Sequence, residues 1–452
     1  MTSIPIILLL RDMIHHYPNT TFIDFKNKLS DEQYLNYKED DHLGMIYINN
    51  DNLDSKPLYN HGSLFIDKTT TPITPIVMHF EPIIYNDDCI KILRNLSSDE
   101  WNKQIIIQPC YEGTTILVFF HNNKWYVTTR RCLDSNESMW IKNKSYRQMF
   151  EESINFSLDD LNKDYCYYFV LIHYSNKNLV SYKDYDKLYK EVIHTMTMEK
   201  YTFKEVEYKI NNLVKTQEIV KYNSLDHLLN RLDEISINDK KNHNVSTEGF
   251  IVKYYTSENT FIIMKLQTHL YQELAQLKPN NSNIYQSYLE LYQKDQLRDF
   301  LPYVPYQCNK LEIIKRINNG MRNMATEILN LYHGTRKKKN SEVYNSLTEQ
   351  YKRVLYGLHG IYINHRKNKV DENNKLTSIT IHDVYFYIKN LPAEQLRQLF
   401  FERWELLKKA CEFFNPTDMY IQVQTILMFK HLFDQNNEKL FDNLIGQNIE
   451  SK

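Results

Sequence analysis

Short runs of β-branched and aromatic residues dominate the middle of the chain, and their length and composition predict β-strands. The runs occupy residues 105–107, 115–120, 124–129, 165–173, 249–255 and 261–266. Only His121-Asn122-Asn123 separates the second run from the third, which predicts a hairpin with a tight turn.

A helical pattern interrupts these strands between residues 225 and 235. Its apolar residues recur on one helix face, at Leu225, Leu228, Leu229, Leu232 and Ile235. Ser224, directly before them, is a suitable N-cap. Antiparallel strands with interspersed helices predict an α+β domain, which we place at residues 89–275.

The two flanking parts of the chain have different patterns. Residues 1–88 mix short apolar runs with Asn, Asp and Pro, and strand-like stretches at 44–48 and 73–84 predict a β-containing segment packed on the next domain. The apolar run Ile4–Leu10 predicts either a strand or the start of a buried helix. Residues 276–452 predict a helical domain with amphipathic helices at 288–300, 311–331, 344–362, 381–391 and 394–414.

Composition narrows the class of protein. Hydrophobic residues make up 42% of the 452 residues and charged residues 25%, which is typical of a folded globular chain. The formal net charge of -1 excludes a strongly basic nucleic-acid coat but allows a local basic groove. The densest basic run is Arg336, Lys337, Lys338 and Lys339, for which a solvated surface is the simpler interpretation.

The cysteines and the N-terminus indicate an intracellular, cytoplasmic protein. None of the six cysteines forms a C-x-x-C pair, so no zinc knuckle is visible, and their scatter fits free thiols in a reducing compartment. Ile4–Leu10 is too short to cross a membrane and lacks the flanks of a signal peptide. The abundance of Tyr, with 35 residues, fits the coding bias of an AT-rich genome such as that of a large DNA virus, which would place the protein in the host cytoplasm or the virion.

Five short segments carry the chemistry, in a fixed order along the predicted strands. They are Cys110-Tyr111-Glu112-Gly113, Thr128-Thr129-Arg130-Arg131, Tyr168-Phe169-Val170, Glu248-Gly249-Phe250-Ile251-Val252-Lys253 and Met264-Lys265-Leu266-Gln267. Their order, spacing and strand context resemble the phage-type ATP-dependent RNA ligases, within the covalent nucleotidyltransferase superfamily. The resemblance covers about residues 89–275.

The first segment departs from the family at its central residue. The family motif is Lys-x-Asp/Glu-Gly, in which the lysine attacks the α-phosphate of ATP; Glu112 and Gly113 match it, but Cys110 stands where the lysine belongs. A thiol on a short stem cannot reach the position of a lysine amine, and small offsets of a nucleophile are costly. The simpler interpretation of Cys110 is a small buried side chain at a strand end.

Two further departures lie in the later segments. Val170 occupies the place where the third family motif usually has a glutamate, and Gln267 occupies the second lysine of a Lys-x-Lys motif. Because residues two apart on a strand face the same way, Gln267 removes a cation from the site itself. Alternation along the strand would likewise turn only one of Arg130 and Arg131 towards the groove.

The resemblance implies roles for the remaining residues. It places Glu112, Gly113, Arg130, Phe169, Glu248, Lys253, Lys265 and Gln267 around a nucleotide, and it gives Glu248 to a metal ion. It also implies ATP and Mg²⁺ as ligands and RNA as a partner, contacted by Arg131 and by the run Arg336, Lys337, Lys338 and Lys339. By position alone, the helical domain is the candidate region for protein partners, and no membrane is expected.

Three hypotheses follow. The first is an RNA-ligase homologue that is catalytically inactive and binds RNA or a nucleotide, or acts as a scaffold in RNA processing. The second is an active ATP-dependent ligase or nucleotidyltransferase with Cys110 as an unconventional nucleophile. The third is a purely structural protein that inherited the fold.

Overall fold

The computed structural model describes residues 5–29, 35–48, 63–80, 84–141, 144–182, 188–208, 210, 214–257, 260–278, 284–304, 310–336, 339, 341–368 and 378–410. The chain divides into two compact units, Met1–Gln276 and Leu277–Lys452. The first combines three larger sheets with helices, and in the described part of the second all regular elements are helical. The predicted α+β class with a C-terminal helical region is therefore confirmed.

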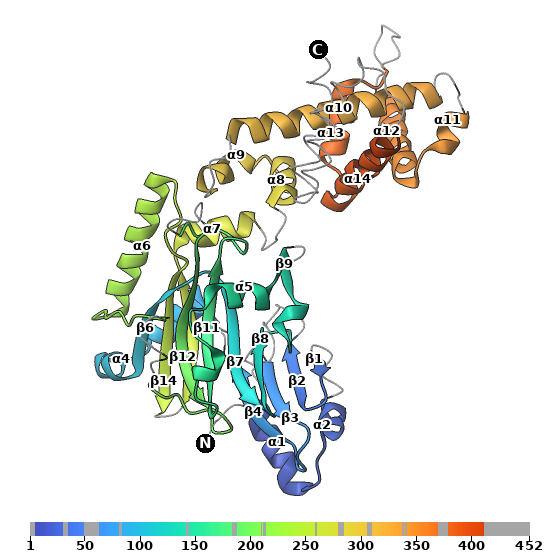
Figure 1. Cartoon of the computed structure of the whole chain (residues 1–452). Helices are drawn as coiled ribbons and strands as arrows, with labels where there is room; N and C mark the ends of the chain where they lie inside the picture. The colour runs from blue at the N-terminus through green and yellow to red at the C-terminus, as the bar shows by residue number, and fades with distance from the viewer. Residues whose placement is uncertain are drawn as a thin grey trace, which may run out of the picture. The chain divides into compact units, whose positions relative to one another are not determined.

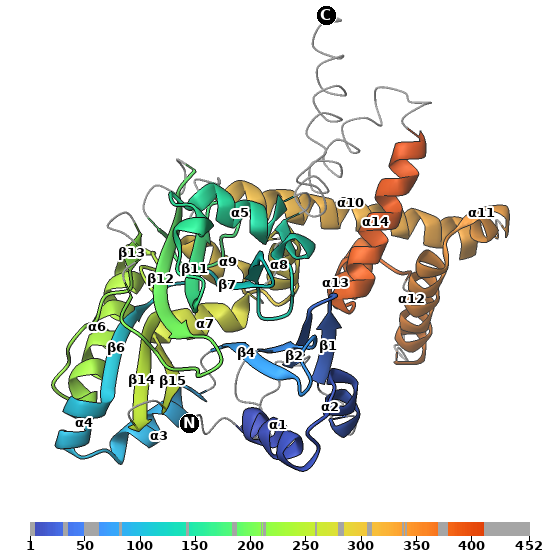
Figure 2. The same ribbon diagram turned by 60° about the horizontal axis from the view of Figure 1, so that its bottom comes forward.

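The N-terminal segment forms two helices and an antiparallel sheet (Figure 2). The elements are α1 (Pro5–His16), α2 (Phe22–Lys28), β1 (Leu35–Glu39), β2 (Leu43–Ile48), β3 (Ser63–Asp67) and β4 (Thr74–His79), with strand order β1-β2-β3-β4. The run Ile4–Leu10 thus lies mostly in a helix, and the strand predicted at 73–84 ends at His79. This sheet shares a hydrophobic core with the next part of the unit, where the rings of Phe65 and Phe119 lie 5.4 Å apart.

Two more sheets build the centre of this unit (Figure 1). One has the order β13-β12-β11-β7-β8, from β7 (Thr114–His121), β8 (Lys124–Thr128), β11 (Tyr165–His173), β12 (Lys190–Glu199) and β13 (Lys215–Thr216). The other has the order β5-β15-β14-β6, from β5 (Ile84–Tyr85), β6 (Ile105–Cys110), β14 (Gly249–Ser257) and β15 (Thr260–Gln267). The short strands β9 (Met139–Ile141) and β10 (Lys144–Ser145) pair separately. The chain passes from the second sheet to the first through Tyr111-Glu112-Gly113, between β6 and β7.

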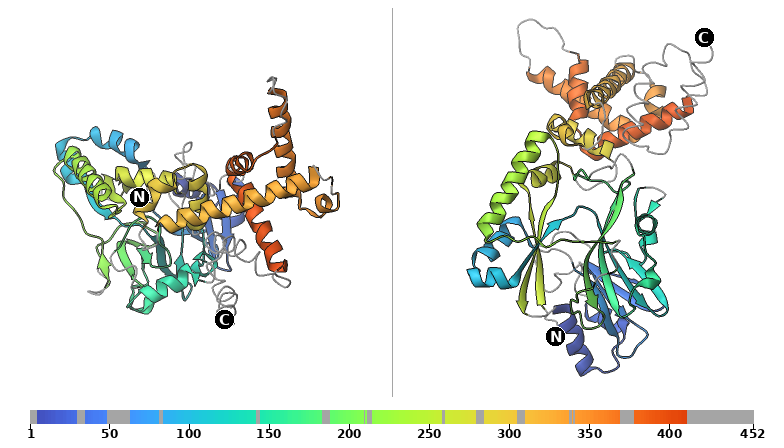
Figure 3. Two further views of the ribbon diagram at one scale, coloured as in Figure 1. Left: turned by 90° about the horizontal axis from the view of Figure 1, so that it is seen from above. Right: turned by 60° about the vertical axis from the view of Figure 1, so that its left-hand side comes forward.

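Helices cover one face of each central sheet (Figure 3). On the β14 sheet these are α3 (Asn86–Arg94), α4 (Ser98–Gln104) and α6 (Leu225–Asn242), whereas α5 (Tyr146–Ser153) packs on the β11 sheet and α7 (His269–Leu277) follows β15. The predicted cap of α6 is confirmed, since the Ser224 side chain accepts a hydrogen bond from the His227 amide. In β14, Phe250 and Val252 point into the core under α6. Strand alternation therefore turns Gly249, Ile251 and Lys253 to the opposite face.

The second unit contains seven α-helices in its described part. They are α8 (Ile284–Gln293), α9 (Leu297–Phe300), α10 (Lys310–Arg336), α11 (Ser341–Ser346), α12 (Glu349–Asn368), α13 (Ile381–Lys389) and α14 (Ala393–Ala410). Two predicted helices are interrupted, between α8 and α9, where Asp295 adopts a positive φ of 60°, and between α11 and α12. Among the described residues of the whole chain, no helix is both long and apolar enough to cross a membrane.

Candidate functional site

Three of the predicted segments meet at one end of the β14 sheet. Gly249 pairs with Cys110 of β6 on one side and with Gln267 of β15 on the other. Gly249 has φ of 146°, and a Cβ there would lie 2.0 Å from the carbonyl oxygen of Leu266, so only glycine fits. This close packing aligns Glu248, which precedes Gly249, with the ends of both neighbouring strands.

The carboxylate of Glu248 is the centre of this cluster. Its Oε1 accepts hydrogen bonds from Lys265 Nζ at 2.8 Å and from Gln267 Nε2 at 2.9 Å, and its Oε2 accepts one from Cys110 Sγ at 3.4 Å. Glu248 is buried, so the ion pair with Lys265 is shielded from water. Burial alone would lower the pKa of Lys265, but the neighbouring carboxylate of Glu248 raises it instead, and the ammonium stays charged.

Cys110 lacks the properties of a nucleophilic thiol. Burial raises its pKa well above the ordinary value; Glu248 adds to this shift, and Lys265 opposes it. A reactive cysteine needs the opposite, a pKa lowered towards neutrality in an accessible, electropositive setting. The thiol therefore stays protonated at neutral pH and acts as a donor to Glu248.

Both polar atoms of the Gln267 side-chain amide form hydrogen bonds. Its Nε2 donates to Glu248, and its Oε1 accepts from Asn86 Nδ2 at 3.0 Å. Its backbone amide also donates to Asn86 Oδ1 at 2.9 Å. A lysine at this position could not accept the bond from Asn86, so the site is adapted to an amide at the position of the second lysine of the Lys-x-Lys motif.

Glu112 has a set of partners that the sequence did not reveal. Its carboxylate accepts from Asn178 Nδ2 at 3.0 Å, the amides of Leu179 at 2.9 Å and Val180 at 2.7 Å, and Tyr271 OH at 2.7 Å. Burial raises the pKa of Glu112, and the bonds from Val180 and Tyr271 oppose that shift. With four donors satisfied, this carboxylate holds the segment after β11 against α7.

Gly113 allows the chain to approach β11 closely. A Cβ at this position would lie 2.5 Å from the carbonyl oxygen of Leu171 and 2.7 Å from Val170 Cγ1. The third segment therefore contacts the first through Val170. Phe169 faces the other way: it is fully buried and packs on Phe150 and Phe156 beneath α5. We therefore leave Phe169 out of the proposed site.

Lys253 lies on the Gly249 face of β14 but outside the Glu248 cluster. Its Nζ forms an ion pair with Glu205 Oε1 at 2.7 Å, and Tyr255 OH donates to Glu205 Oε2 at 2.7 Å. Lys253 is only 5% exposed. Its charge is thus balanced within the fold.

Arg130 and Arg131 occupy a tight turn after β8. Thr129 and Cys132 exchange backbone hydrogen bonds of 3.1 and 3.2 Å across them. The prediction that strand alternation separates the two arginines is wrong, because neither lies on a strand. Arg130 is close to His79, where burial first and then this guanidinium lower the imidazole pKa to about 3.

The basic run belongs to the helical unit. Arg336 is the last residue of α10, and its guanidinium carbon lies 5.9 Å from the centroid of the Tyr344 ring. Lys339 has a positive φ of 54°. Lys337 and Lys338 fall outside the residues that the structure describes.

The described residues do not fit a Mg²⁺ ion at Glu248. Such ions take several oxygen ligands, usually with more than one carboxylate or with substrate phosphates. Both oxygens of Glu248 are already engaged, and no group of three or more His, Cys, Asp or Glu side chains suited to a metal occurs in the described part of the chain.

Comparison with known proteins supports the resemblance. No protein-family model matches the chain. Over 241 residues the sequence is 24% identical to an RNA ligase of Rhodothermus phage RM378, covering 46% of this chain and 54% of that protein. Over 44 residues it is 41% identical to an immediate-early protein ICP-46 homologue of Invertebrate iridescent virus 3, covering 10% of each chain. The chain thus spans about half the length of the phage ligase.

Solved structures give weaker similarities. Two structures of an archaeal ATP-dependent RNA ligase, forms 1 and 2, each match this chain with a TM-score of 0.39. Each match covers 70% of this chain and 79% of the ligase chain, and the sequence identity is 10% for form 1 and 11% for form 2. Similarity of this size adds no argument to the sequence match. The match to the phage ligase, together with the convergence of the first, fourth and fifth segments on Glu248, bears out the family likeness predicted from the motifs.

Proposed function

We propose that this chain, a relative of the RNA-ligase-type nucleotidyltransferases, binds RNA without forming a covalent nucleotidyl intermediate. The observation that carries the proposal is the Cys110 thiol, which donates to Glu248 at the position of the family's nucleophile. Binding to RNA rests on the relationship to a phage RNA ligase.

The state of the neighbouring residues supports the loss of the covalent step. Nucleotidyl transfer depends chiefly on cations placed around the transferring phosphate. Here Lys265 is tied to Glu248, Lys253 is tied to Glu205, and Gln267 has replaced a cation. A triphosphate and its metal ion would have to displace a buried ion pair before binding, which is costly.

The covalent step has a direct test. The full chain is incubated with α-labelled ATP or GTP and Mg²⁺ or Mn²⁺, denatured, and examined for label bound to the polypeptide. We expect none, because neither a lysine nor an ionised thiol is present at position 110.

Two cysteine variants separate the alternatives in this assay. Label that is lost in Cys110→Ala and kept in Cys132→Ala would establish the second hypothesis, an active enzyme with a cysteine nucleophile. Cys132 is a suitable comparison because it is also buried and also has a raised pKa, mainly through burial.

RNA binding is tested by its dependence on salt. We expect the logarithm of the affinity for a single-stranded RNA to fall linearly with the logarithm of salt concentration, with a slope of about -0.7 for each neutralised phosphate. Arg131→Gln should make the slope shallower by about 0.7, the share of one phosphate contact. Arg147→Gln is the matched control, because Arg147 is paired with Glu151 on α5.

Absence of RNA binding at low salt would contradict the proposal. It would favour the third hypothesis, a protein that uses the inherited fold as a scaffold. In that case the helical unit would be the first place to look for protein partners.

A further inference from the structure

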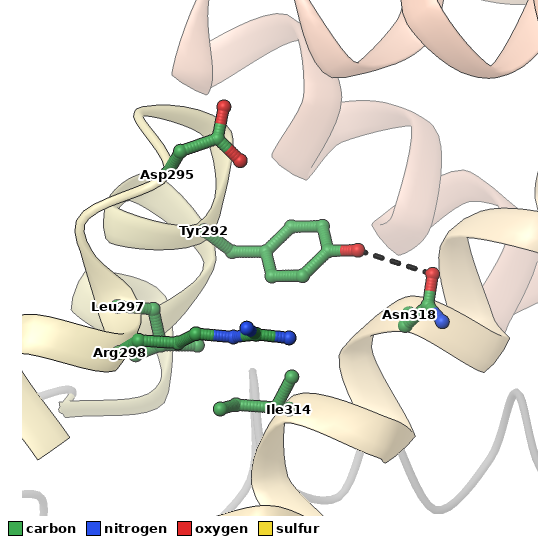
Figure 4. Close-up of a pocket in the computed structure, with 6 residues that line it drawn as sticks. All are labelled: Tyr292, Asp295, Leu297, Arg298, Ile314 and Asn318. Atoms are coloured by element: carbon green, nitrogen blue, oxygen red, sulfur yellow. Dashed lines mark hydrogen bonds between the residues drawn. The ribbon is translucent and has the colours of Figure 1, made fainter.

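A pocket of about 420 Å³ lies within the helical unit, and none of its lining residues belongs to a segment that carries the family resemblance. It is lined by Tyr292, Asp295, Leu297, Arg298, Ile314 and Asn318, from α8, α9, α10 and the bend between α8 and α9 (Figure 4). Its volume is within the range of sites for small organic ligands, about 300–1,000 Å³.

One wall of the pocket is an aromatic ring in a fixed position. The hydroxyl of Tyr292 donates to Asn318 Oδ1 at 3.1 Å and lies 2.6 Å from the hydroxyl of Tyr385. These bonds hold the ring across the pocket, as Figure 4 shows, with Ile314 and Leu297 as apolar neighbours. Such a ring, held by its own hydroxyl, offers a planar surface for stacking.

Arg298 supplies the positive charge that an anionic ligand needs. The structure gives its exposed side chain no hydrogen bond or ion pair with any described residue, and Figure 4 shows its guanidinium extended beside Tyr292 and Ile314. Arginine binds phosphate oxygens through its planar fork of donors. The ring of Tyr292 can thus stack on a planar group, and the guanidinium of Arg298 beside it can bind a phosphate.

The charges around the pocket favour an anionic ligand. The single carboxylate in the lining, Asp295, is neutralised by Lys389 Nζ at 2.5 Å. Burial and Tyr385 raise the pKa of Tyr292 while the guanidinium of Arg322 opposes this shift, so the phenol stays neutral and a second arginine is within electrostatic reach. Because Asp295 is paired with Lys389, the charge of Arg298 has no counter-ion among the residues that line the pocket.

We infer that this pocket binds a nucleotide, with its base on the ring of Tyr292 and its phosphate on Arg298. The nucleotide is either a free nucleoside monophosphate or one residue of a single-stranded RNA, since both present the same base and phosphate. The site goes beyond the proposed function, because it lies in the other unit and does not involve Cys110 or Glu248.

Photo-cross-linking tests the assignment. The full chain is irradiated with 5-iodouridine monophosphate in one arm and with a short single-stranded oligoribonucleotide carrying 5-iodouridine in the other, and the cross-linked peptide is mapped by mass spectrometry. We expect the cross-link at Tyr292 in at least one arm, and the arm that gives it identifies the source of the nucleotide.

Three variants establish the role of each group. Arg298→Ala should lower the cross-linking at Tyr292 by about tenfold or more, since it removes a charge-assisted contact. Tyr292→Leu should weaken binding of the cross-linking ligand by about tenfold, whereas Tyr292→Phe, which keeps the ring, should bind much like the parent. Arg353→Ala is the control, because Arg353 is an exposed arginine on α12 outside the pocket.

The outcomes distinguish this site from RNA binding by the chain as a whole. Cross-links confined to other peptides, or a cross-link at Tyr292 that is unchanged in Arg298→Ala, would overturn the nucleotide pocket. If the oligoribonucleotide still binds in either case, the proposed function stands and only the second site is lost.

Discussion

Replacing Glu112 with alanine should lower the free energy of unfolding by about 3 kcal/mol or more, since each buried donor left without a partner costs about 1–3 kcal/mol. The substitution removes the shared acceptor of four donors at once, from Asn178, Leu179, Val180 and Tyr271. Two of them are backbone amides that cannot turn towards other partners. Urea unfolding of the full chain measures the change as a shift in midpoint with an unchanged slope.

Two comparisons define what this result means. Glu218→Ala, at an exposed glutamate, should be neutral to within about 0.5 kcal/mol. Tyr271→Phe removes one of the four donors and should cost about 1 kcal/mol. If Glu112→Ala leaves the free energy of unfolding unchanged, the carboxylate is not needed for the stability of the fold. That result would favour the nucleotide-binding role that the motif implies for Glu112.

The features that the sequence predicted well are those encoded locally. The hairpin β7–β8 follows from two strand-forming runs around Asn122 and Asn123, which both adopt the positive φ that a tight turn needs. The helix beginning at Leu225 follows from its apolar face and its serine cap, and both are present. Neither feature depends on the rest of the chain.

The partners of the site residues depend on pairing between distant segments, and there the sequence was insufficient. Glu112 is bonded to residues 66 to 159 positions away, and no spacing rule indicates such contacts. Phe169 lies on the same face of β11 as Tyr167 and Leu171, and this face packs beneath α5, whereas Tyr168 lies on the other face. The segment alone does not indicate which of its two faces a helix will cover, so the sequence could not place the aromatic residue of the motif in the core.

Among the strands that were not predicted, β12 is the longest, and it was missed for the same reason. β12 contains Glu191, His194, Thr195 and Thr197, which break the apolar run that indicates a strand. Its pairing along the whole of β11 supplies the stabilisation that its own composition lacks. Arg130 and Arg131 were assigned to a strand because the run before them is strand-like, but the bonds between Thr129 and Cys132 end that strand in a turn.

Lowering the pH from 6.5 to 5 should reduce the stability of the first unit by about 5 kcal/mol, through three buried histidines. Burial lowers the pKa of His79 from 6.5 to about 3, and those of His173 and His194 to about 4. The folded pKa values lie below the unfolded value, so the unfolded chain takes up protons first as the pH falls. The stabilisation is complete well above pH 6.5 and is lost towards the folded pKa values, at a slope that approaches about 1.4 kcal/mol per pH unit for each histidine below pH 6.

The surroundings of the three rings explain why protonation is resisted. His79 contacts Thr128 and lies near Arg130, while His194 lies 2.8 Å from Thr197 Oγ1 and near Lys253. His173 has Glu152 Oε2 at 3.3 Å, but its burial outweighs this attraction. A loss of about 5 kcal/mol is comparable to the whole stability of a marginally stable domain, so the first unit should unfold in mild acid.

Tryptophan fluorescence follows this unfolding, because Trp101, Trp125 and Trp140 all belong to the first unit and only Trp404 lies outside it. His194→Gln should remove about one third of the pH slope, since an amide can keep a bond to Thr197 without titrating. His227→Gln, at an exposed histidine, should leave the slope as it is. A stability that stays constant between pH 6.5 and 5 would mean that these rings accept protons within the folded unit, and the burial that the structure assigns to them would then be wrong.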